Sequence, residues 1–506
     1  MTMNIASRLE YYLTEKGRFD CFLIHALGYP LLFVFVCMGL CFDSMGIGDH
    51  SNGMRVFALL GIIVALVCLF MFKGSKPRPS VGIFTILTVY LLVIVLCAIP
   101  YLFFGFDIKY AFFESISGIT TTGMSVIHLS QMEDPILMWR AVTGWMGGFM
   151  FISMFCLYIG DFALPGRFFF ASGTASVDSD VYTPQIIKIA MRYGMVYLAS
   201  TFVMAVLLIV TGVDVQMSVR MAMSTVSTTG FQDIHGGLDA FEPASRIVIG
   251  LFMFISLFNF TTLFFAITKR TFKPIKEDNE NLYLFSWLLI IGAIAAVLLF
   301  QFGDFPDDAE GVLDFVLVVL SNASTTGFMV YDYNWPAALV LTFSLLAVIG
   351  GCIDSPTGGI KVARAAISLK IMKKEITEVA FPNQVSTIRV RRVNVSRDLA
   401  YGALLTMLTF FIVLVGGTIL ISFTELNMED ALCLATSALT TTGKGLYSLG
   451  DITDVNTFAQ CVCAVLMIIG RLEAVLFLMI LSPDFWHDLV SRINIRKLIS
   501  DRHPRF

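Results

Sequence analysis

The sequence has little charge. Only 14% of its 506 residues are Asp, Glu, Lys or Arg, against about 25% in ordinary soluble domains. Hydrophobic residues make up 57%, and the mean hydropathy is +0.80. A water-soluble fold cannot bury so much apolar surface, so lipid is the solvent for most of the chain. This excludes extracellular, fibrous, disordered and nucleic-acid-binding proteins, and a net charge of −4 is too small to indicate a partner.

The chain also lacks the motifs that enzyme chemistry requires. Its ten Cys form no CxxC pair, and its six His have no metal-binding spacing. Neither a GxGxxG following a strand nor a P-loop occurs. Neighbouring apolar runs contain no paired His or Asp that could serve as nucleophile and base. We therefore predict that the protein is not an enzyme and has no cofactor bound to this chain.

Ten apolar runs approach or exceed the length of about 20 residues that crosses a bilayer. They lie at 22–42, 54–72, 81–104, 136–160, 189–212, 245–268, 282–302, 336–350, 399–423 and 457–481. The first run has no small-residue cleavage site and is followed at once by a second, so we predict a span rather than a signal peptide. The run at 336–350 is unusually short.

The basic residues sort by membrane side. With a cytoplasmic N-terminus, 27 of the 34 Lys and Arg fall in cytoplasmic segments and six in outer segments. This is a strong positive-inside pattern. Acids such as Asp304, Glu310 and Glu425 gather in the outer segments, where they would attract a cation. The pattern predicts a multi-pass protein whose two termini are cytoplasmic.

Four short polar phrases recur on the outer side, and each reads Ser-x-x-(Ser/Thr)-Thr-Thr-Gly. They occupy 117–123, 224–230, 321–327 and 437–443, with glycines 107, 97 and 116 residues apart. Apolar stretches too short to cross a membrane precede them, at 109–121, 216–228, 312–324 and 429–441. A single copy would more readily be a helix-packing face or an outer turn. Four copies in register predict four re-entrant half-helices, each followed by extended chain that lines a pore.

The chemistry of these phrases suits a cation. Backbone carbonyl and threonine oxygens are hard, neutral ligands that can replace the hydration shell of an ion. Each half-helix directs its partially negative C-terminus at the centre, and the final glycine tolerates backbone angles that a Cβ disfavours. The residues by themselves indicate a monovalent cation and leave potassium and sodium open.

The order of span, half-helix, polar phrase and span resembles the Trk/Ktr/HKT superfamily of potassium transporters. Three further phrases match: Trp-Met-Gly-Gly at 145–148, the Gly-rich segment 350–361, and Gly-Arg-Leu-Glu at 470–473. Two extra N-terminal spans favour the Trk-type membrane subunit over the eight-span Ktr type. The resemblance covers about 20–482. It implies an all-α polytopic fold, with two N-terminal helices and four span–pore-loop–span repeats around a pseudo-fourfold pore.

The expected divisions of the chain follow this pattern. They are an N-terminal hairpin at 1–78, pore repeats at 79–188, 189–280, 281–397 and 398–482, and a cytoplasmic tail at 483–506.

The resemblance implies that potassium, as the substrate, binds at the threonines and glycines of the four phrases. These are Thr121, Thr122, Gly123, Thr228, Thr229, Gly230, Thr325, Thr326, Gly327, Thr441, Thr442 and Gly443. Sodium-preferring relatives often carry Ser at the position of Gly123, so the implied function is potassium uptake across the bacterial inner membrane. Two alternatives are a sodium-selective or sodium-coupled transporter of the same fold and a carrier of a small organic solute. The latter would not need four equivalent loops.

Arg471 is a charge near the middle of the last span. At 1.5 Å per residue it lies about 20 Å from the outer end, where a charge costs at least about 2.5–3.5 kcal/mol. The resemblance implies a fixed positive charge in the pore below the four phrases, which opposes ion passage. The alternative is a structural contact with helix carbonyls or with Glu473, although residues two apart do not share a helix face.

The segment 350–361 cannot continue a helix because of its glycines and proline. The breaking residues are Gly350, Gly351, Pro356, Gly358 and Gly359. The resemblance implies an intramembrane loop that gates the pore, with Asp354 and Lys361 as candidate anchors. The alternative is a plain cytoplasmic turn.

Two remaining features concern ion entry and partners. Lys444 follows the last phrase, where it would either repel incoming cations or pair with an outer acid. The segment 361–397 carries nine Lys and Arg, and the tail adds five more. Such segments suit a cytoplasmic face on anionic lipid. The resemblance further implies a homodimer and a cytoplasmic ring of regulatory subunits that binds NAD or ATP.

Overall fold

The computed structural model of the protein describes most of the chain. The described residues are 27–42, 49–71, 79–154, 182–233, 237–277, 279–302, 308–330, 336–381, 389–390, 393–394, 397–424, 426–443, 455–472 and 479–487. Within them the chain is helical almost throughout. The strands found there form one two-stranded hairpin of β1 (Arg389–Val390) and β2 (Val393–Asn394). The predicted all-α fold class is confirmed.

The chain divides into two compact units, residues 1–97 with 475–506, and residues 98–474. The first unit contains an apolar helix at Leu27–Phe42, α2 (Asp49–Met71) and most of α3 (Pro79–Phe103). Arg55 of α2 donates hydrogen bonds from Nε (3.2 Å) and Nη2 (3.1 Å) to the carbonyl oxygen of Phe42. These bonds satisfy a carbonyl that the end of the first helix leaves open.

The second unit contains four times a short half-helix, an extended segment and a closing helix, and in repeats 2 to 4 a long helix precedes them. Repeat 1 has the end of α3, α4 (Ile108–Ile119) and α5 (Asp134–Met154), with η1 (Leu129–Gln131) between the last two. Repeat 2 has α7 (Tyr182–Val210), α8 (Val215–Val226), η4 (Gly237–Ala240), α9 (Pro243–Ser256) and α10 (Phe260–Thr268), and then α11 (Lys273–Glu277). Repeat 3 has α12 (Asn279–Phe302), α13 (Ala309–Ala323) and α14 (Ala337–Ile349), and then α15 (Val362–Ala380). Repeat 4 has α16 (Arg397–Ser422), α17 (Met428–Leu439) and α18 (Thr457–Leu472).

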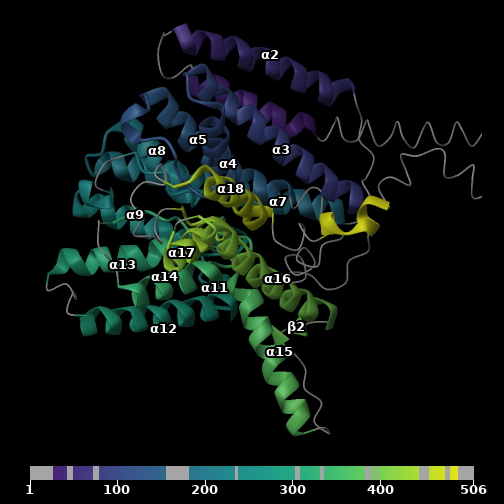
Figure 1. The fold of residues 1–506 in the computed structure, drawn as a ribbon, viewed down its shortest axis with the longest axis vertical. Helices are drawn as coiled ribbons and strands as arrows, with labels where there is room; N and C mark the ends of the chain where they lie inside the picture. The colour runs from purple at the N-terminus through teal and green to yellow at the C-terminus, as the bar shows by residue number, and fades with distance from the viewer. Residues whose placement is uncertain are drawn as a thin grey trace, which may run out of the picture. The chain divides into compact units, whose positions relative to one another are not determined.

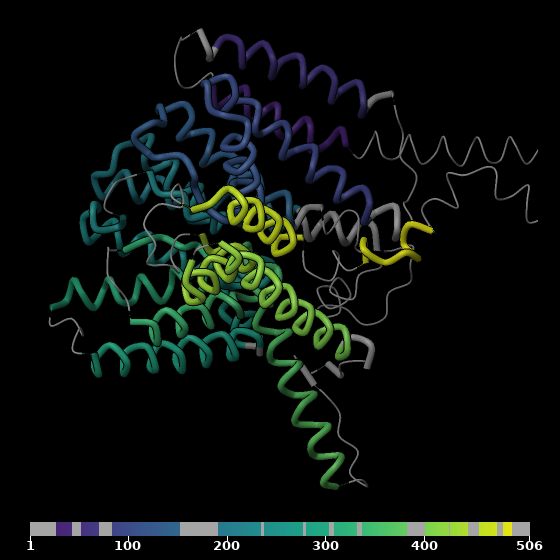
Figure 2. Tube along the Cα trace, in the orientation of Figure 1, coloured from purple at the N-terminus to yellow at the C-terminus, as the bar shows by residue number. Residues whose placement is uncertain are grey.

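The repeats pack in a closed order. The closing helix of each repeat contacts the half-helix of the next: α5 packs on α8, α9 on α13, and α14 on α17. The last closing helix, α18, returns to the first half-helix, α4, as the yellow and blue segments in Figure 2 show. Helices α12, α13 and α14 lie side by side, while α15 leads away from them (Figure 1). This cyclic packing brings the four half-helices to one site.

The half-helices predicted from the four short apolar stretches are confirmed close to their expected bounds. Each begins after an Asp or Asn N-cap: Asp107, Asp214, Asp308 and Asn427. The carboxylate of Asp214 accepts from the amide of Gln216 (3.0 Å), and that of Asp308 accepts from Gly311 (3.0 Å). A side-chain acceptor at this position satisfies amides that the first helical turn leaves open.

Several predicted crossings differ from one long helix. Five described helices, α2, α3, α7, α12 and α16, are long and apolar enough to span, whereas Leu27–Phe42, α14 and α18 are shorter. The run 245–268, predicted as one span, is bent by 105° between α9 and α10. There the carbonyl oxygen of Leu257 accepts from the amide of Cys352 (2.9 Å), and the side chain of Asn259 caps α10 by accepting from the amide of Thr262 (2.9 Å).

Candidate ion pathway

The four Thr-Thr-Gly segments meet at the C-terminal ends of the half-helices. All eight threonines and four glycines predicted to bind the ion are buried, and no threonine among them is more than 1% exposed. We call these four segments the filter, and the side on which the half-helices begin its outer side. The structure therefore brings the predicted ion-binding residues of all four repeats together.

The filter glycines show that the four segments close into a ring. Each faces the carbonyl oxygen of the second threonine in the next repeat. The pairs are Gly123 with Thr229, Gly230 with Thr326, Gly327 with Thr442, and Gly443 with Thr122. A Cβ at any of these glycines would lie closer to that oxygen than real Cβ atoms do. The glycines have φ between +70° and +77°, so both space and backbone conformation require glycine.

The first threonine of each filter segment adopts a left-handed backbone. The φ angles are +54° at Thr121, +57° at Thr228, +54° at Thr325 and +56° at Thr441. This conformation is a genuine outlier for a β-branched residue, and such strain gathers at functional sites. The sequence does not predict this conformation, because a β-branched residue disfavours a left-handed turn.

The second threonine of each segment turns its side chain into the wall of the site. Its hydroxyl hydrogen-bonds the hydroxyl two residues earlier, at 2.8, 2.6, 2.7 and 2.7 Å in repeats 1 to 4. Its amide donates to the carbonyl of the first serine of the phrase, at 2.8 to 3.0 Å. With amide and hydroxyl both engaged, the carbonyl oxygen is the group of this threonine that faces the neighbouring glycine.

The hydroxyls of the four first threonines differ in their hydrogen bonds: two are bonded to the loop 350–361 and two are not. Thr228 donates to the carbonyl oxygen of Pro356 (3.2 Å), and the Thr325 hydroxyl accepts from the amide of Gly358 (2.7 Å). The hydroxyls of Thr121 and Thr441 are buried and have no hydrogen-bond partner among the described residues. The loop 350–361 therefore touches the filter from below through repeats 2 and 3.

That loop is the break predicted between α14 and α15. It contains four left-handed residues: Gly350 (φ +68°), Asp354 (+65°), Gly359 (+75°) and Lys361 (+79°). The predicted gating glycines hold its two ends together. A Cβ at Gly350 would collide with the carbonyl of Gly358, and one at Gly359 would approach the carbonyl of Ala347. The amide of Gly351 donates to the Thr357 hydroxyl (3.1 Å).

Two carboxylates fix the loop to neighbouring helices. The Asp354 carboxylate accepts from the amide of Thr261 (3.3 Å) and from its hydroxyl, and the Asp354 carbonyl accepts from the amide of Phe260 (3.2 Å). Glu280, at the start of α12, accepts from the amide of Ile353 (2.6 Å). Asp354 was a predicted anchor, whereas Glu280 could not be predicted, because no local pattern relates the start of α12 to the loop.

Lys361 folds back over the loop. Its ammonium donates to the Ser355 carbonyl (3.2 Å), the Ser355 hydroxyl (3.3 Å), the Thr357 hydroxyl (2.9 Å) and the Thr357 carbonyl. Lys361 itself is buried. The ammonium thus gathers four oxygens of one turn and holds the turn compact.

Arg471 lies against the same loop and is only 2% exposed. Its Nη1 donates to the carbonyl oxygen of Pro356 (3.0 Å), which also accepts from Thr228. Its guanidinium lies 4.4 Å from the ring centroid of Phe151, a cation–π contact. Nε and Nη2 have no hydrogen-bond partner among the described residues. The hydrogen-bond acceptor of Arg471 is thus a carbonyl of the loop rather than of its own helix. Glu473 and Lys444 lie outside the described residues.

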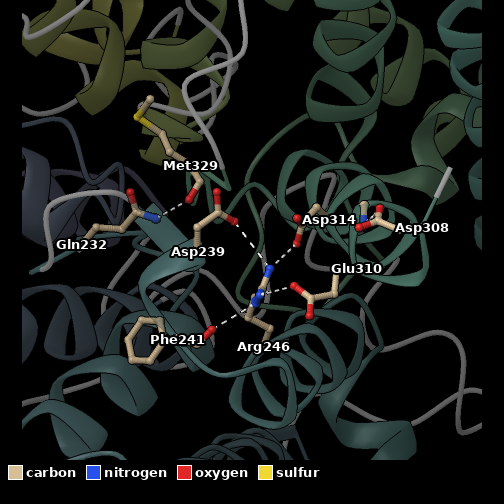
Figure 3. Close-up of polar contacts among 9 residues, drawn as sticks. Gln232, Asp239, Phe241, Arg246, Asp308, Glu310, Asp314 and Met329 are labelled. Carbon is tan, nitrogen blue, oxygen red and sulfur yellow. Dashed lines mark hydrogen bonds and ion pairs between the residues drawn. The ribbon is translucent and has the colours of Figure 1, made fainter. Parts of the chain in front are cut away.

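On the outer side, Arg246 of α9 joins repeats 2 and 3 (Figure 3). Its guanidinium contacts Asp314 (2.8 Å), Glu310 (3.3 Å) and Asp239 (3.5 Å), and Nε donates to the carbonyl of Phe241 (3.1 Å). Burial, with the nearby charge of Asp314, raises the pKa of Asp239 above its ordinary value against the opposing effect of Arg246. Three carboxylates therefore share one cation.

Further outer contacts join the repeats around the filter. Arg220 of α8 contacts Asp233, just after the second filter segment (2.9 Å), and Asp134 at the start of α5 (3.5 Å). Gln232 donates from Nε2 to the carbonyl of Met329 (2.8 Å), as Figure 3 also shows. Of the acids predicted to form an outer face, Glu310 is paired with Arg246, while Asp304 and Glu425 lie outside the described residues.

Comparison with known proteins gives a consistent result. The family model for TrkH, described as a cation transport protein, matches residues 54–487. The Trk system potassium uptake protein TrkH of Halomonas elongata is 27% identical over 385 residues, which cover 74% of this chain and 79% of that protein. TrkG of Escherichia coli is 26% identical over 427 residues, covering 82% and 87%. The crystal structure of the potassium transporter TrkH from Vibrio parahaemolyticus has a TM-score of 0.82 at 22% identity, covering 92% of this chain and 99% of that one, which shows a shared fold.

Proposed function

Because the chain belongs to the TrkH family of cation transport proteins, we propose that it takes up potassium through the ring of four filter segments. Its family and apolar helices make it a multi-pass bacterial membrane transporter rather than an enzyme. The observation that carries the proposal is the closed ring of filter glycines and second-threonine carbonyls. Such carbonyls can replace the hydration shell of a potassium ion, and the half-helix C-termini add negative potential.

Ion passage is gated below the filter by the loop 350–361 together with Arg471. The proposal is supported by the contacts of Pro356 and Gly358 with filter threonines and by the hydrogen bond from Arg471 to Pro356. A guanidinium at this depth adds an electrostatic barrier to a cation that leaves the filter. Opening requires that the loop withdraw and that Arg471 exchange its contact for another.

The termini are cytoplasmic, and the basic face is the regulatory side. The helix α15 carries Lys370, Lys373 and Lys374 next to a stripe of exposed apolar side chains. The stripe consists of Leu369, Met372, Ile376 and Val379. Such a stripe supports association with a second copy of the chain, and the basic residues support contact with anionic lipid and a nucleotide-binding regulatory ring.

Growth at low potassium tests the uptake function. Expression of the chain in a bacterial strain that lacks its own potassium uptake should restore growth at low external potassium. If sodium competes for the filter, growth should fail when the external ratio of sodium to potassium is high. Failure to restore growth at any ratio, with the protein present in the membrane, would contradict the proposal. Flux into liposomes with and without a proton gradient then separates channel-like flow from proton coupling.

A further inference from the structure

The segment that follows the filter glycine is anchored in one way in repeats 2 and 3 and in another way in repeat 1. In those repeats the first serine of the phrase anchors the residue after the filter glycine. Ser224 donates to the carbonyl of Phe231 (3.0 Å), and Ser321 donates to that of Phe328 (3.0 Å). The equivalent hydroxyl of Ser117 is buried and has no partner among the described residues. Repeat 1 must therefore hold its outgoing segment by other means.

Glu114 provides that anchor. It lies in α4, one turn before Ser117, and is fully buried. Its Oε1 accepts from the hydroxyl of Ser125 (2.6 Å) and from the amides of Val126 (2.9 Å) and Ile127 (3.4 Å). Three donors from one short segment thus converge on one oxygen, and that segment begins two residues after Gly123.

No other repeat has a carboxylate here. Three residues before the first serine of their phrases, repeats 2, 3 and 4 carry Met221, Val318 and Leu434. A buried carboxyl is costly unless it is hydrogen-bonded, and hydrogen bonds from backbone amides to a carboxylate are among the stronger ones. At this position, repeats 2 to 4 have an apolar side chain, whereas repeat 1 has a carboxylate that accepts hydrogen bonds.

This contact reaches the filter through the backbone. The segment 124–127 continues from Gly123, which faces Thr229, and from Thr122, whose carbonyl faces Gly443. Movement of the segment would shift both junctions of repeat 1 with its neighbours. The carbonyl oxygens of such a ring replace the water around an ion, so a shift of these junctions changes the ring that the ion meets.

We propose that Glu114 is a positioning residue that fixes the outer end of the repeat 1 filter segment and thereby sets ion discrimination by the ring. The inference rests on the proposed function of the ring as the filter. Its role is that of a hydrogen-bond acceptor acting on 125–127, and it does not itself contact the ion.

Ion flux through the purified full-length protein in liposomes tests this role. Glu114→Met, which gives repeat 1 the side chain of repeat 2, should raise the ratio of sodium to potassium flux by about tenfold, since it leaves the buried amides of Val126 and Ile127 without their acceptor. The Ser125 hydroxyl retains a second acceptor, the carbonyl of Ile127 (3.0 Å). Glu114→Gln keeps an acceptor oxygen and should shift the ratio by less than about threefold. Ser286→Ala, in α12, removes an exposed hydroxyl that donates to a carbonyl of its own helix and serves as the control with an unchanged ratio.

The outcomes separate this inference from the function on which it rests. Gly123→Ser alters the filter itself; if it leaves the flux ratio unchanged, the proposed filter is wrong and the inference fails with it. If Gly123→Ser shifts the flux ratio and Glu114→Met does not, only the role of Glu114 is overturned. The same holds if Glu114→Gln shifts the flux ratio as much as Glu114→Met does. Where Glu114→Met does not reach the membrane, Glu114→Leu, which gives repeat 1 the side chain that repeat 4 has as Leu434, decides: a shifted ratio supports the role, and an unchanged ratio overturns it.

Discussion

The two sides of the filter hold their buried cations in different ways. On the outer side, Arg246 and Arg220 each contact two or more carboxylates that come from different repeats. On the inner side, Arg471 contacts a backbone carbonyl and an aromatic ring, and Lys361 contacts hydroxyls and carbonyls of one turn. These two outer arginines are paired with carboxylates, whereas the inner contacts are made with neutral groups. A third outer arginine, Arg140, contacts the sulfur of Met132 (3.1 Å) and the ring of Phe231 (4.2 Å).

The difference indicates which side can move. Removing one partner from a partly buried ion pair leaves an unpaired charge, so the outer clusters resist separation of the repeats. A hydrogen bond from a charged donor to a neutral carbonyl contributes about 1.5–3 kcal/mol net, less than the about 3–5 kcal/mol that breaking a buried ion pair costs, and water can replace the carbonyl as acceptor. We therefore expect the outer side to be the fixed frame of the filter and the proposed gate to open on the inner side.

The largest change in potassium flux is expected from a substitution in the filter itself, which separates the outer side from the inner side. Gly230→Ala places a Cβ against the Thr326 carbonyl at a residue with φ +74°. The left-handed backbone alone costs about 1–2 kcal/mol, and relief of the collision must displace the carbonyl ring. We expect potassium flux in liposomes to fall by more than about tenfold. Gly416→Ala in α16, where nothing lies near the added Cβ, is the control; equal flux in the two variants would contradict a rigid ring.

The next effect compares the two sides directly. Arg471→Met removes the inner charge and its bond to Pro356, so basal potassium flux without any regulatory partner should rise by about fivefold or more. The matched variant Arg246→Met leaves Asp239, Glu310 and Asp314 without their shared cation. It should lower the free energy of unfolding by about 1–3 kcal/mol, measured by thermal denaturation in detergent, and leave basal flux unraised. Opposite results for the two arginines would reverse the assignment of frame and gate.

Features that depend on local pattern could be predicted from the sequence. The half-helices follow from apolar stretches of fixed length, and the break at 350–361 follows from its glycines and proline. The meeting of four filter segments follows from their repetition. For the half-helices and the break, the residues that determine the structure are neighbours in the chain; for the filter, the same local pattern occurs four times.

Features that depend on distant partners could not be predicted. The bend within 245–268 involves the amide of Cys352 and the carboxylate of Asp354, both nearly a hundred residues later. The contact of Glu280 with Ile353 has the same origin. Glu114 lies in an apolar stretch, where a single carboxylate is expected at the surface, but it is buried in the structure. The left-handed threonines oppose the preference of their own residue type and are held by the ring around them.

A smaller effect is expected where the inner loop is fixed to α10. Thr261→Val removes the hydroxyl that donates to the Asp354 carboxylate and keeps the shape of the side chain. The loop retains the amide bond from residue 261 and the contacts of Glu280 and Lys361. Basal potassium flux should therefore rise by only about two- to fivefold, less than in Arg471→Met. Thr88→Val, which removes a hydroxyl bonded to its own helix in the first unit, is the control. A flux unchanged by Thr261→Val would show that this anchor does not hold the gate closed.

The smallest effect concerns the pH dependence of the outer frame. Burial and the charge of Asp314 raise the pKa of Asp239 despite Arg246. An acid whose pKa is higher in the folded than in the unfolded chain binds more protons when folded, so its contribution to stability is present at about pH 4 and is lost as the pH rises through the raised value. Asp239→Asn cannot ionise and should melt at a higher temperature than the wild type near neutral pH, with the difference vanishing toward about pH 4. The exposed Asp107→Asn, which makes no side-chain cap bond, controls for loss of an outer carboxylate. A melting temperature lowered at neutral pH by Asp239→Asn would instead show that attraction to Arg246 outweighs burial and repulsion, and that all three carboxylates of the cluster stabilise the frame.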